Sequence, residues 1–162
     1  MLSKLPRDRE GVVKAISLWQ PWASALFTPL KKFETRHWPV PRSIIGQRVC
    51  IHAAKKRDAD VRDFWETLDS DELAEFTKIG IASFDQLPFG AIIGQLDLVE
   101  CHRTEDLRVQ PGTHDYEWGN HAPGRFAWEC ANAARLPRPV PCVGRQGFFD
   151  VESQLRPFAN PS

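Results

Sequence analysis

The segment that indicates the fold most clearly is residues 12–36, which reads VVKAISLWQPWASALFTPLKKFETR. Its first part, 12–18, is rich in apolar and β-branched side chains and predicts a short strand. Pro21 then precedes the apolar stretch 22–27, and a proline at this place is typical of the start of a helix. The segment closes with the charged run 31–36. The first expected unit is therefore a strand that passes directly into a short helix, followed by a charged stretch.

The rest of the chain predicts further short strands and a helical pair. Strands are expected over 47–53, 89–101, 125–130 and 147–151, the second of them kinked at Gly94. Residues 58–79 have apolar side chains at helical spacing and predict two helices, with Asp69 and Glu72 as a capping box and Gly80 at the end. The strands do not alternate regularly with helices, as a doubly wound fold would require. We expect an α+β fold that is mainly β, a small and partly closed β-barrel with two or three helices packed outside.

Length and composition indicate one soluble domain. The chain has 162 residues, of which 42% are hydrophobic, with ten Phe and six Trp that can fill a core. We expect a domain over 12–152, an N-terminal extension over 1–11 and a C-terminal tail over 153–162. Charge-free runs are too short for a membrane span and the start lacks a signal peptide, so a cytoplasmic protein is expected.

The cysteines and the charges narrow the class of protein. The four cysteines, Cys50, Cys101, Cys130 and Cys142, form no CxxC pair and predict buried free thiols, with no metal site and no cofactor. The net charge is zero, yet residues 31–62 hold nine basic and three acidic side chains, and residues 63–117 hold three and thirteen. One basic patch on a dipolar molecule fits this distribution better than a surface that binds nucleic acid all round.

Four ordered stretches of the sequence resemble the ASCH domain family. Its signature is Gly-x-Lys-x-x-Glu-x-Arg, and Lys31, Glu34 and Arg36 match it, with Pro29 at the glycine position. Bacterial ASCH proteins are also similar at three later stretches, residues 49–55, 87–94 and 118–128. This resemblance implies a PUA-like β-barrel with a cleft that binds RNA or modified bases.

The resemblance implies two classes of function. Some ASCH members resemble non-enzymatic nucleic-acid-binding modules, and a few relatives are nucleases. Small bacterial members are amidohydrolases that remove the acyl group from the exocyclic amine of acylated cytidines, using a lysine, a threonine and a glutamate. Lys31 stands at the position of their lysine, and Glu34 stands where they have the threonine.

The chemistry of residues 31–36 allows a catalytic interpretation and a structural one. A lysine acts on an amide as a nucleophile only after losing a proton, which burial or a cation such as Arg36 promotes and a carboxylate such as Glu34 opposes. Glu34 is also a candidate proton shuttle, and Thr35 offers a hydroxyl. The alternative is an exposed ion-pair cluster with no reaction to perform.

Candidate binding residues extend along the same positive part of the chain. Trp19 and Gln20, at a strand end, are placed to stack on a base and to bond its edge. His52, Lys55, Lys56 and Arg57 are candidates to hold phosphates, and Arg36 is a further candidate for substrate binding. The apolar helix face favours a core position for Trp22, and Trp38 fits either interpretation.

The loop 113–121 is expected to form the second wall of a site. Glu117 is the candidate distal acid, with Asp115 as a substitute, although solvated acidic residues are the commoner case. Arg125 and Trp128 on the next strand can face the same cleft, or Trp128 can be core with Arg125 on the surface.

Two hypotheses therefore remain open. The protein is an amidohydrolase acting on a modified pyrimidine nucleoside, with Lys31, Glu34 and Glu117 as catalytic residues, or it binds single-stranded RNA or DNA without turnover. The acidic middle of the chain argues against a long nucleic-acid footprint and favours a small ligand. The oligomeric state is left open by the sequence.

Overall fold

A computed structural model describes residue 7 and residues 11–155 of the chain. One six-stranded sheet forms its centre, in the order β2-β5-β4-β3-β1-β6. The strand bounds are β1 Lys14–Leu18, β2 Phe33–Arg36, β3 Arg48–Ala53, β4 Ala91–Arg103, β5 Phe126–Pro141 and β6 Phe148–Asp150. Neighbouring strands are antiparallel except β1 and β3, which run parallel.

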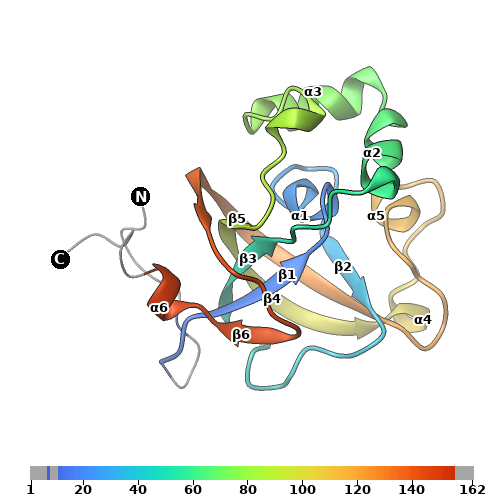
Figure 1. Ribbon diagram of the computed structural model, residues 1–162. Helices are drawn as coiled ribbons and strands as arrows, with labels where there is room; N and C mark the ends of the chain where they lie inside the picture. The colour runs from blue at the N-terminus through green and yellow to red at the C-terminus, as the bar shows by residue number, and fades with distance from the viewer. Residues whose placement is uncertain (1–6, 8–10, 156–162) are drawn as a thin grey trace.

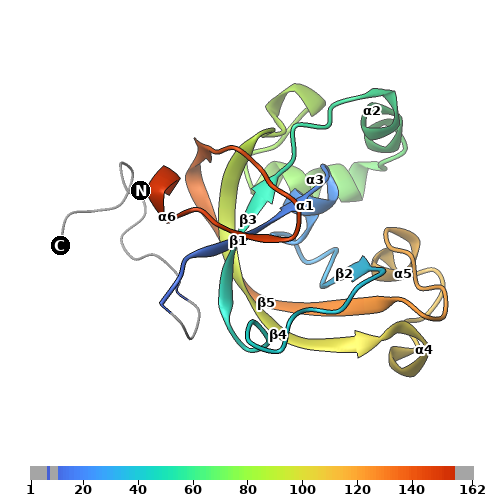
Figure 2. The ribbon, with the colours of Figure 1, turned by 60° about the horizontal axis from the view of Figure 1, so that its bottom comes forward.

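The sheet curls into an open barrel, as Figure 1 and Figure 2 show. The long strands β4 and β5 bend around the centre of the molecule, and the register of their pairing shifts near Gly94, the position of the expected kink. A side chain there has no room, because a Cβ on Gly94 would lie 2.4 Å from the Phe27 ring and 2.6 Å from the Ala134 carbonyl oxygen. The curl encloses the largest apolar cluster, which includes Leu18, Leu96 and Trp128.

Two helices pack outside the barrel where the helical spacing predicts them. They are α2 Ala59–Glu66 and α3 Ser70–Lys78, and they lie together above one end of the barrel (Figure 1). The capping box of α3 is present in full, with Asp69 and Glu72 bonding each other's backbone amides at 2.8 and 2.9 Å. The apolar faces of both helices pack on a separate cluster that also contains Ala25 and Trp118.

Short helices complete the described part of the chain. They are α1 Trp22–Ala25, η1 Phe84–Gln86, α4 Thr104–Leu107, α5 His114–Glu117 and α6 Glu152–Leu155. The expected α+β, mainly β barrel is confirmed, and single-turn helices raise the helix count above the two or three that the sequence predicts. The expected extension 1–11 and tail 153–162 lie mostly outside the described residues, although Leu155 is fully buried beside Val13 and Val151.

Two further features concern the class of protein. All four cysteines are free, and Cys50, Cys130 and Cys142 are buried, as the sequence predicts. Burial raises the pKa of the Cys50 and Cys130 thiols to about 12. Among the described residues, no helix combines the length and the apolar character that crossing a bilayer requires.

Candidate functional site

A cleft of about 590 Å³ opens between the end of β1, the strand β2 and the helices α1, α2 and α5. The curl of the sheet creates it, because β2 and β1 lie close together although three strands separate them in the sheet order. A hydrogen bond of 3.0 Å joins them directly, from Arg36 Nη2 on β2 to the Ser17 carbonyl oxygen on β1. Residues far apart in sequence therefore face one cavity.

Lys31 forms part of the floor of the cleft, two residues before β2. Its side chain is only 1% exposed, and its ammonium contacts the Phe33 carbonyl oxygen and lies 3.7 Å from Glu34 Oε2. An ammonium withdrawn from water requires such partners, since burying it alone is very costly. The exposed ion-pair cluster considered above is therefore wrong for Lys31.

Glu34 lies between two cations. Its Oε2 faces Lys31, and its Oε1 accepts a hydrogen bond of 3.1 Å from Arg36 Nε. Glu34 and Arg36 are two positions apart on β2, so both side chains point to the same side of the strand. The Arg36 guanidinium also lies 5.7 Å from the ring of Trp128, which is buried in the barrel core. The result is a row of alternating charges along the floor of the cleft.

Aromatic side chains form one wall. The rings of Trp22 and Phe64 lie 4.6 Å apart, and Phe64 contacts Trp118 edge-on at 5.7 Å. Trp22 is half-buried against the apolar cluster on which α2 and α3 pack, here called the helical cluster, and it also lines the cleft. The predicted core position therefore describes only part of its role. Trp19 is 55% exposed, with the Lys56 ammonium 3.8 Å from its ring centre, and it offers a free aromatic face.

The segment around α5 forms the opposite wall and is fixed to β2. The Asp115 carboxylate accepts hydrogen bonds of 2.9 Å from the backbone amides of both Lys32 and Phe33. Asp115 thus holds the wall in place, which leaves Glu117 as the carboxylate of this segment that lines the cleft. The Glu117 Oε1 accepts from the Gly112 amide at 3.1 Å.

A close contact near Gly119 narrows the cleft. The Thr35 hydroxyl accepts a hydrogen bond of 2.8 Å from the Asn120 amide, and a Cβ on Gly119 would lie 3.2 Å from Thr35 Cγ2. Because the hydroxyl oxygen accepts this bond, its proton stays available to a ligand. Arg125 stands at the same end, where its Nε donates to the Asn120 carbonyl at 3.2 Å.

Seven of the ten site residues expected from the sequence line this cleft. They are Trp19, Lys31, Glu34, Thr35, Arg36, Glu117 and Arg125. The structure also brings in residues that the sequence did not single out, namely Ser17, His37, Phe64, Trp118 and Asn120. Phe64 and Trp118 carried no separate signal, because aromatic residues at apolar positions are mostly core.

The remaining three expected residues lie elsewhere. Gln20 is fully buried, and its side-chain amide is bonded to Ser24 and to the Pro88 carbonyl at 2.8 to 3.0 Å. Lys55 is exposed and lines no part of the cleft, its side chain lying over Gly90. Neither residue lines the cleft, so the structure does not bring Gln20 and Lys55 together with the other candidates.

His52 is a buried structural residue. Its Nε2 donates to the Cys142 carbonyl at 2.7 Å, and its Nδ1 lies 2.9 Å from the Ser17 hydroxyl. Burial lowers the pKa of this imidazole, with the nearby Lys55 charge as a smaller contribution in the same direction. The neutral ring satisfies both contacts, and His52 does not line the cleft.

The described residues contain no group of three or more His, Cys, Asp or Glu side chains arranged to hold a metal ion. The polar groups of the cleft are instead an ammonium, two guanidinium groups, an imidazole, a side-chain amide, two hydroxyls and two carboxylates. These groups can bind a polar ligand, polarise a carbonyl and move protons.

Comparisons with known proteins agree with the architecture. A model of the ASCH domain matches residues 16–139. Among solved structures, the ASCH protein from Zymomonas mobilis is similar, with 14% identity, a TM-score of 0.53, and coverage of 90% of this chain and 92% of that one. A single-substitution variant of that protein gives 15% identity, a TM-score of 0.55, and coverage of 94% and 95%. No curated protein matches the chain by sequence.

Proposed function

Because the chain belongs to the ASCH domain family, an RNA-binding-related family, we propose that its cleft binds a pyrimidine nucleoside acylated on the exocyclic amine and hydrolyses that amide. One observation carries the proposal: the buried Lys31 ammonium lies beside the Glu34 carboxylate at the floor of a cleft with aromatic walls. The aromatic walls suit the binding of a flat base, and the ammonium beside the carboxylate suits the cleavage of an amide.

The aromatic side chains supply the binding. A pyrimidine offers two π-faces, and stacking on an aromatic side chain contributes about 1–3 kcal/mol per base. Trp19, exposed and at the mouth of the cleft, is the residue placed to stack. The hydroxyl of Thr35 and the guanidinium of Arg125 can bond the polar edge of the base or the sugar.

The charged row supplies the chemistry. An ammonium has three donors, so Lys31 can bond the Phe33 carbonyl and still donate to the acyl oxygen of a ligand. Glu34 or Glu117 accepts a proton from a water molecule as the water oxygen bonds the acyl carbon. The carbon–nitrogen bond then breaks, the same carboxyl group returns the proton to the departing amine, and the products are the nucleoside and a free acid.

Lys31 therefore acts in this proposal as an electrophilic donor to the carbonyl oxygen. The ammonium keeps its ion pair with Glu34 and donates a hydrogen bond, and water is the nucleophile. An ammonium aimed at an oxygen on which negative charge develops stabilises the transition state more than the ground state. The family's threonine position is occupied by Glu34, and Thr35 beside it supplies a hydroxyl in the same cleft.

A second candidate is binding of single-stranded RNA without turnover. The observation in its favour is the Lys56 ammonium over the exposed Trp19 ring, since cations interleaved with aromatic faces are typical of single-strand binding. Lys56 also pairs with Asp58 at 3.1 Å, which reduces the positive charge it presents. The small, partly acidic cleft favours the hydrolase.

The deciding experiment is incubation with cytidine acylated on its exocyclic amine. We expect release of cytidine and the free acid, which liquid chromatography detects. Binding should also quench tryptophan fluorescence. Trp19→Leu should weaken binding at least tenfold, whereas Trp65→Phe, in the helical cluster, should not. Quenching without any product would contradict the hydrolase and leave the RNA-binding candidate.

A further inference from the structure

A second cavity, also about 590 Å³, adjoins the cleft and shares four lining residues with it. The shared residues are Ser17, Trp19, Arg36 and His37. Its outer side is formed by Trp38 and by the segment 145–147, which connects β5 to β6. The cleft and this second cavity therefore adjoin each other at Trp19 and Arg36, and the two together are called the groove.

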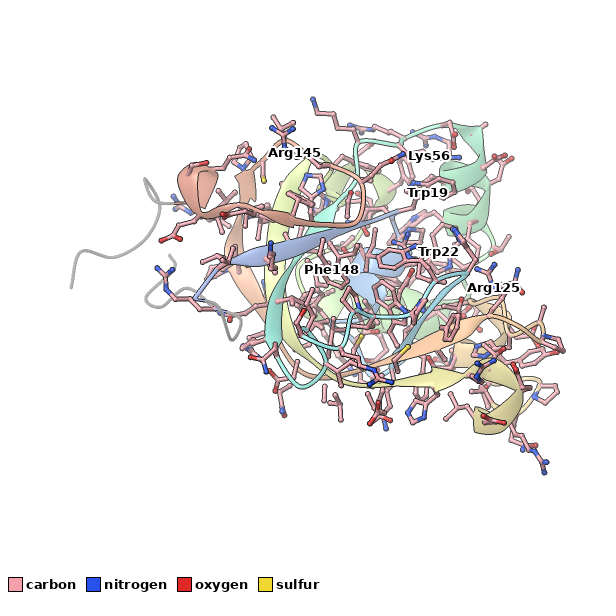
Figure 3. All side chains as sticks on the ribbon, turned by 90° about the horizontal axis from the view of Figure 1, so that it is seen from below. Trp19, Trp22, Lys56, Arg125, Arg145 and Phe148 are labelled. Carbon is pink, nitrogen blue, oxygen red and sulfur yellow. The ribbon has the colours of Figure 1, made fainter. Side chains whose placement is uncertain are left out.

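The two halves of the groove differ in charge. Glu34 and Glu117 line the cleft, while the titratable residues that line the second cavity are Arg36, His37 and Arg145, with no carboxylate among the described residues that form it. Seen from below in Figure 3, Arg145 and Arg125 lie to either side of Trp19 and Trp22. A ligand that spans the groove thus meets both carboxylates and cations in the cleft, and cations without carboxylates in the second cavity.

Arg145 is the cation that distinguishes the second cavity. It is exposed and lines this cavity but not the cleft. Within the part of the chain that the structure describes, no carboxylate lies within 4.0 Å of its guanidinium, whereas Arg36 is already paired with Glu34. Five N–H donors in a planar fork suit a phosphate group, which needs several donors at once.

We propose that the second cavity binds a phosphate group of the ligand whose base occupies the cleft. The substrate class is then a phosphorylated pyrimidine, either a nucleotide or a residue within RNA, rather than a free nucleoside. This inference rests on the proposed binding of a base in the cleft. It explains why carboxylates line the cleft but not the second cavity, since a nucleotide has its negative charge on one side of its base.

The test compares ligands that differ only in phosphate. Dissociation constants for cytidine, its 5′- and 3′-monophosphates and a cytidine trinucleotide are measured by titration calorimetry at two salt concentrations. We expect at least one phosphorylated ligand to bind about tenfold more tightly than cytidine, or about 1.4 kcal/mol. A preference for a monophosphate indicates a free nucleotide, and a preference for the trinucleotide indicates RNA.

The variant Arg145→Gln tests whether the preference for phosphorylated ligands arises in the second cavity. It should remove most of the phosphate preference and reduce the dependence on salt, while the affinity for cytidine stays within about twofold. Arg138→Gln, an exposed arginine of β5 that lines neither cavity, is the matched control and should change neither value. Equal affinities for cytidine and all its phosphorylated forms would overturn the proposal, and so would a preference that survives in Arg145→Gln.

Failure here is distinguishable from failure of the proposed hydrolysis. If acylated cytidine is cleaved but phosphate adds no affinity, the hydrolase stands and the phosphate site does not. If phosphorylated ligands bind through Arg145 and no acyl group is released, the phosphate site stands and the hydrolase does not.

Discussion

The hydroxyl oxygen of Thr35 accepts a hydrogen bond from the backbone amide of Asn120 at 2.8 Å, across 85 positions of sequence. This bond joins the floor of the cleft to its opposite wall. We predict that Thr35→Val, which keeps the shape and removes the acceptor, lowers the free energy of unfolding by about 1 kcal/mol. It should also weaken cytidine binding, measured by calorimetry.

Thr35→Ser is the matched control, because it keeps the hydroxyl. It should bind cytidine within about threefold of the unaltered protein. Equal affinity for Thr35→Val would mean that the bond does not set the geometry of the cleft.

The second prediction concerns Lys31. Lys31→Met keeps an unbranched side chain of similar length and removes the charge, so release of acid from acylated cytidine should fall at least about a hundredfold. Because Lys31 is buried beside Glu34, we also expect urea unfolding to show a loss of about 1–3 kcal/mol, unlike a surface change.

Two comparisons separate chemistry from stability in this case. Lys55→Met, exposed and outside the cleft, should alter neither measurement. The double change Lys31→Met with Glu34→Gln should stay inactive, because the ammonium and the adjacent carboxylate are both removed. Normal turnover by Lys31→Met would rule out the proposed role of its ammonium.

The third prediction is a dependence of stability on pH that arises from His52. Burial lowers the pKa of His52 in the folded protein below its value of about 6.5 in the unfolded chain. In the interval between the two values the unfolded state binds more protons, so stability is full above about pH 6.5 and is lost as the pH falls through that interval.

The measurement is the free energy of unfolding between pH 8 and pH 5. Each unit of separation between the two pKa values contributes about 1.4 kcal/mol to the loss. His52→Gln should flatten the curve over this interval. A curve unchanged in His52→Gln would contradict the assignment.

The fourth prediction concerns the bend of β4. Gly94→Ala places a methyl group against the Phe27 ring and the Ala134 carbonyl oxygen, and the backbone oxygen cannot move aside. We expect a loss of about 1–3 kcal/mol in thermal or urea unfolding. Val99→Ala, on an exposed part of the same strand, serves as the comparison, and similar losses in both would contradict the close contact.

Much of the architecture could be predicted from local patterns, but β2 could not. Phe33–Arg36 carries charges at Glu34 and Arg36, and these side chains face the cleft instead of bulk water. A strand whose inner face is polar lacks the apolar alternation that identifies strands. The same side chains were recognisable as a candidate site, because the family signature covers them.

The length of β5 could not be predicted from the sequence either. The strand continues to Pro141 through Pro137 and Pro139, which normally argue against a strand. The three prolines are two positions apart, and this half of β5 pairs only with β4, since β2 contacts residues 126–129. Pro137 and Pro139 lie between Arg135 and Val140, where the register with β4 shifts, and a proline is tolerated at such an interruption.

Two of the three expected residues that lie outside the cleft are there for the same reason. Gln20 and His52 are polar residues at strand ends, a position that predicts ligand contact. Their actual partners, Pro88 and Cys142, are 68 and 90 positions away, and no local pattern reveals such contacts. Asp115 likewise reads as a possible acid, while its bonds to two distant amides make it structural.

Those two bonds of Asp115 also bear on self-association. β2 is the last strand at one side of the sheet, and the free amides of an edge strand are a template on which another chain can add a strand. The Asp115 carboxylate already occupies the amides of Lys32 and Phe33 at the start of that edge. The wall that shapes the cleft thus protects the sheet from edge-to-edge aggregation, so changes that loosen the wall should favour aggregates as well as weaken ligand binding.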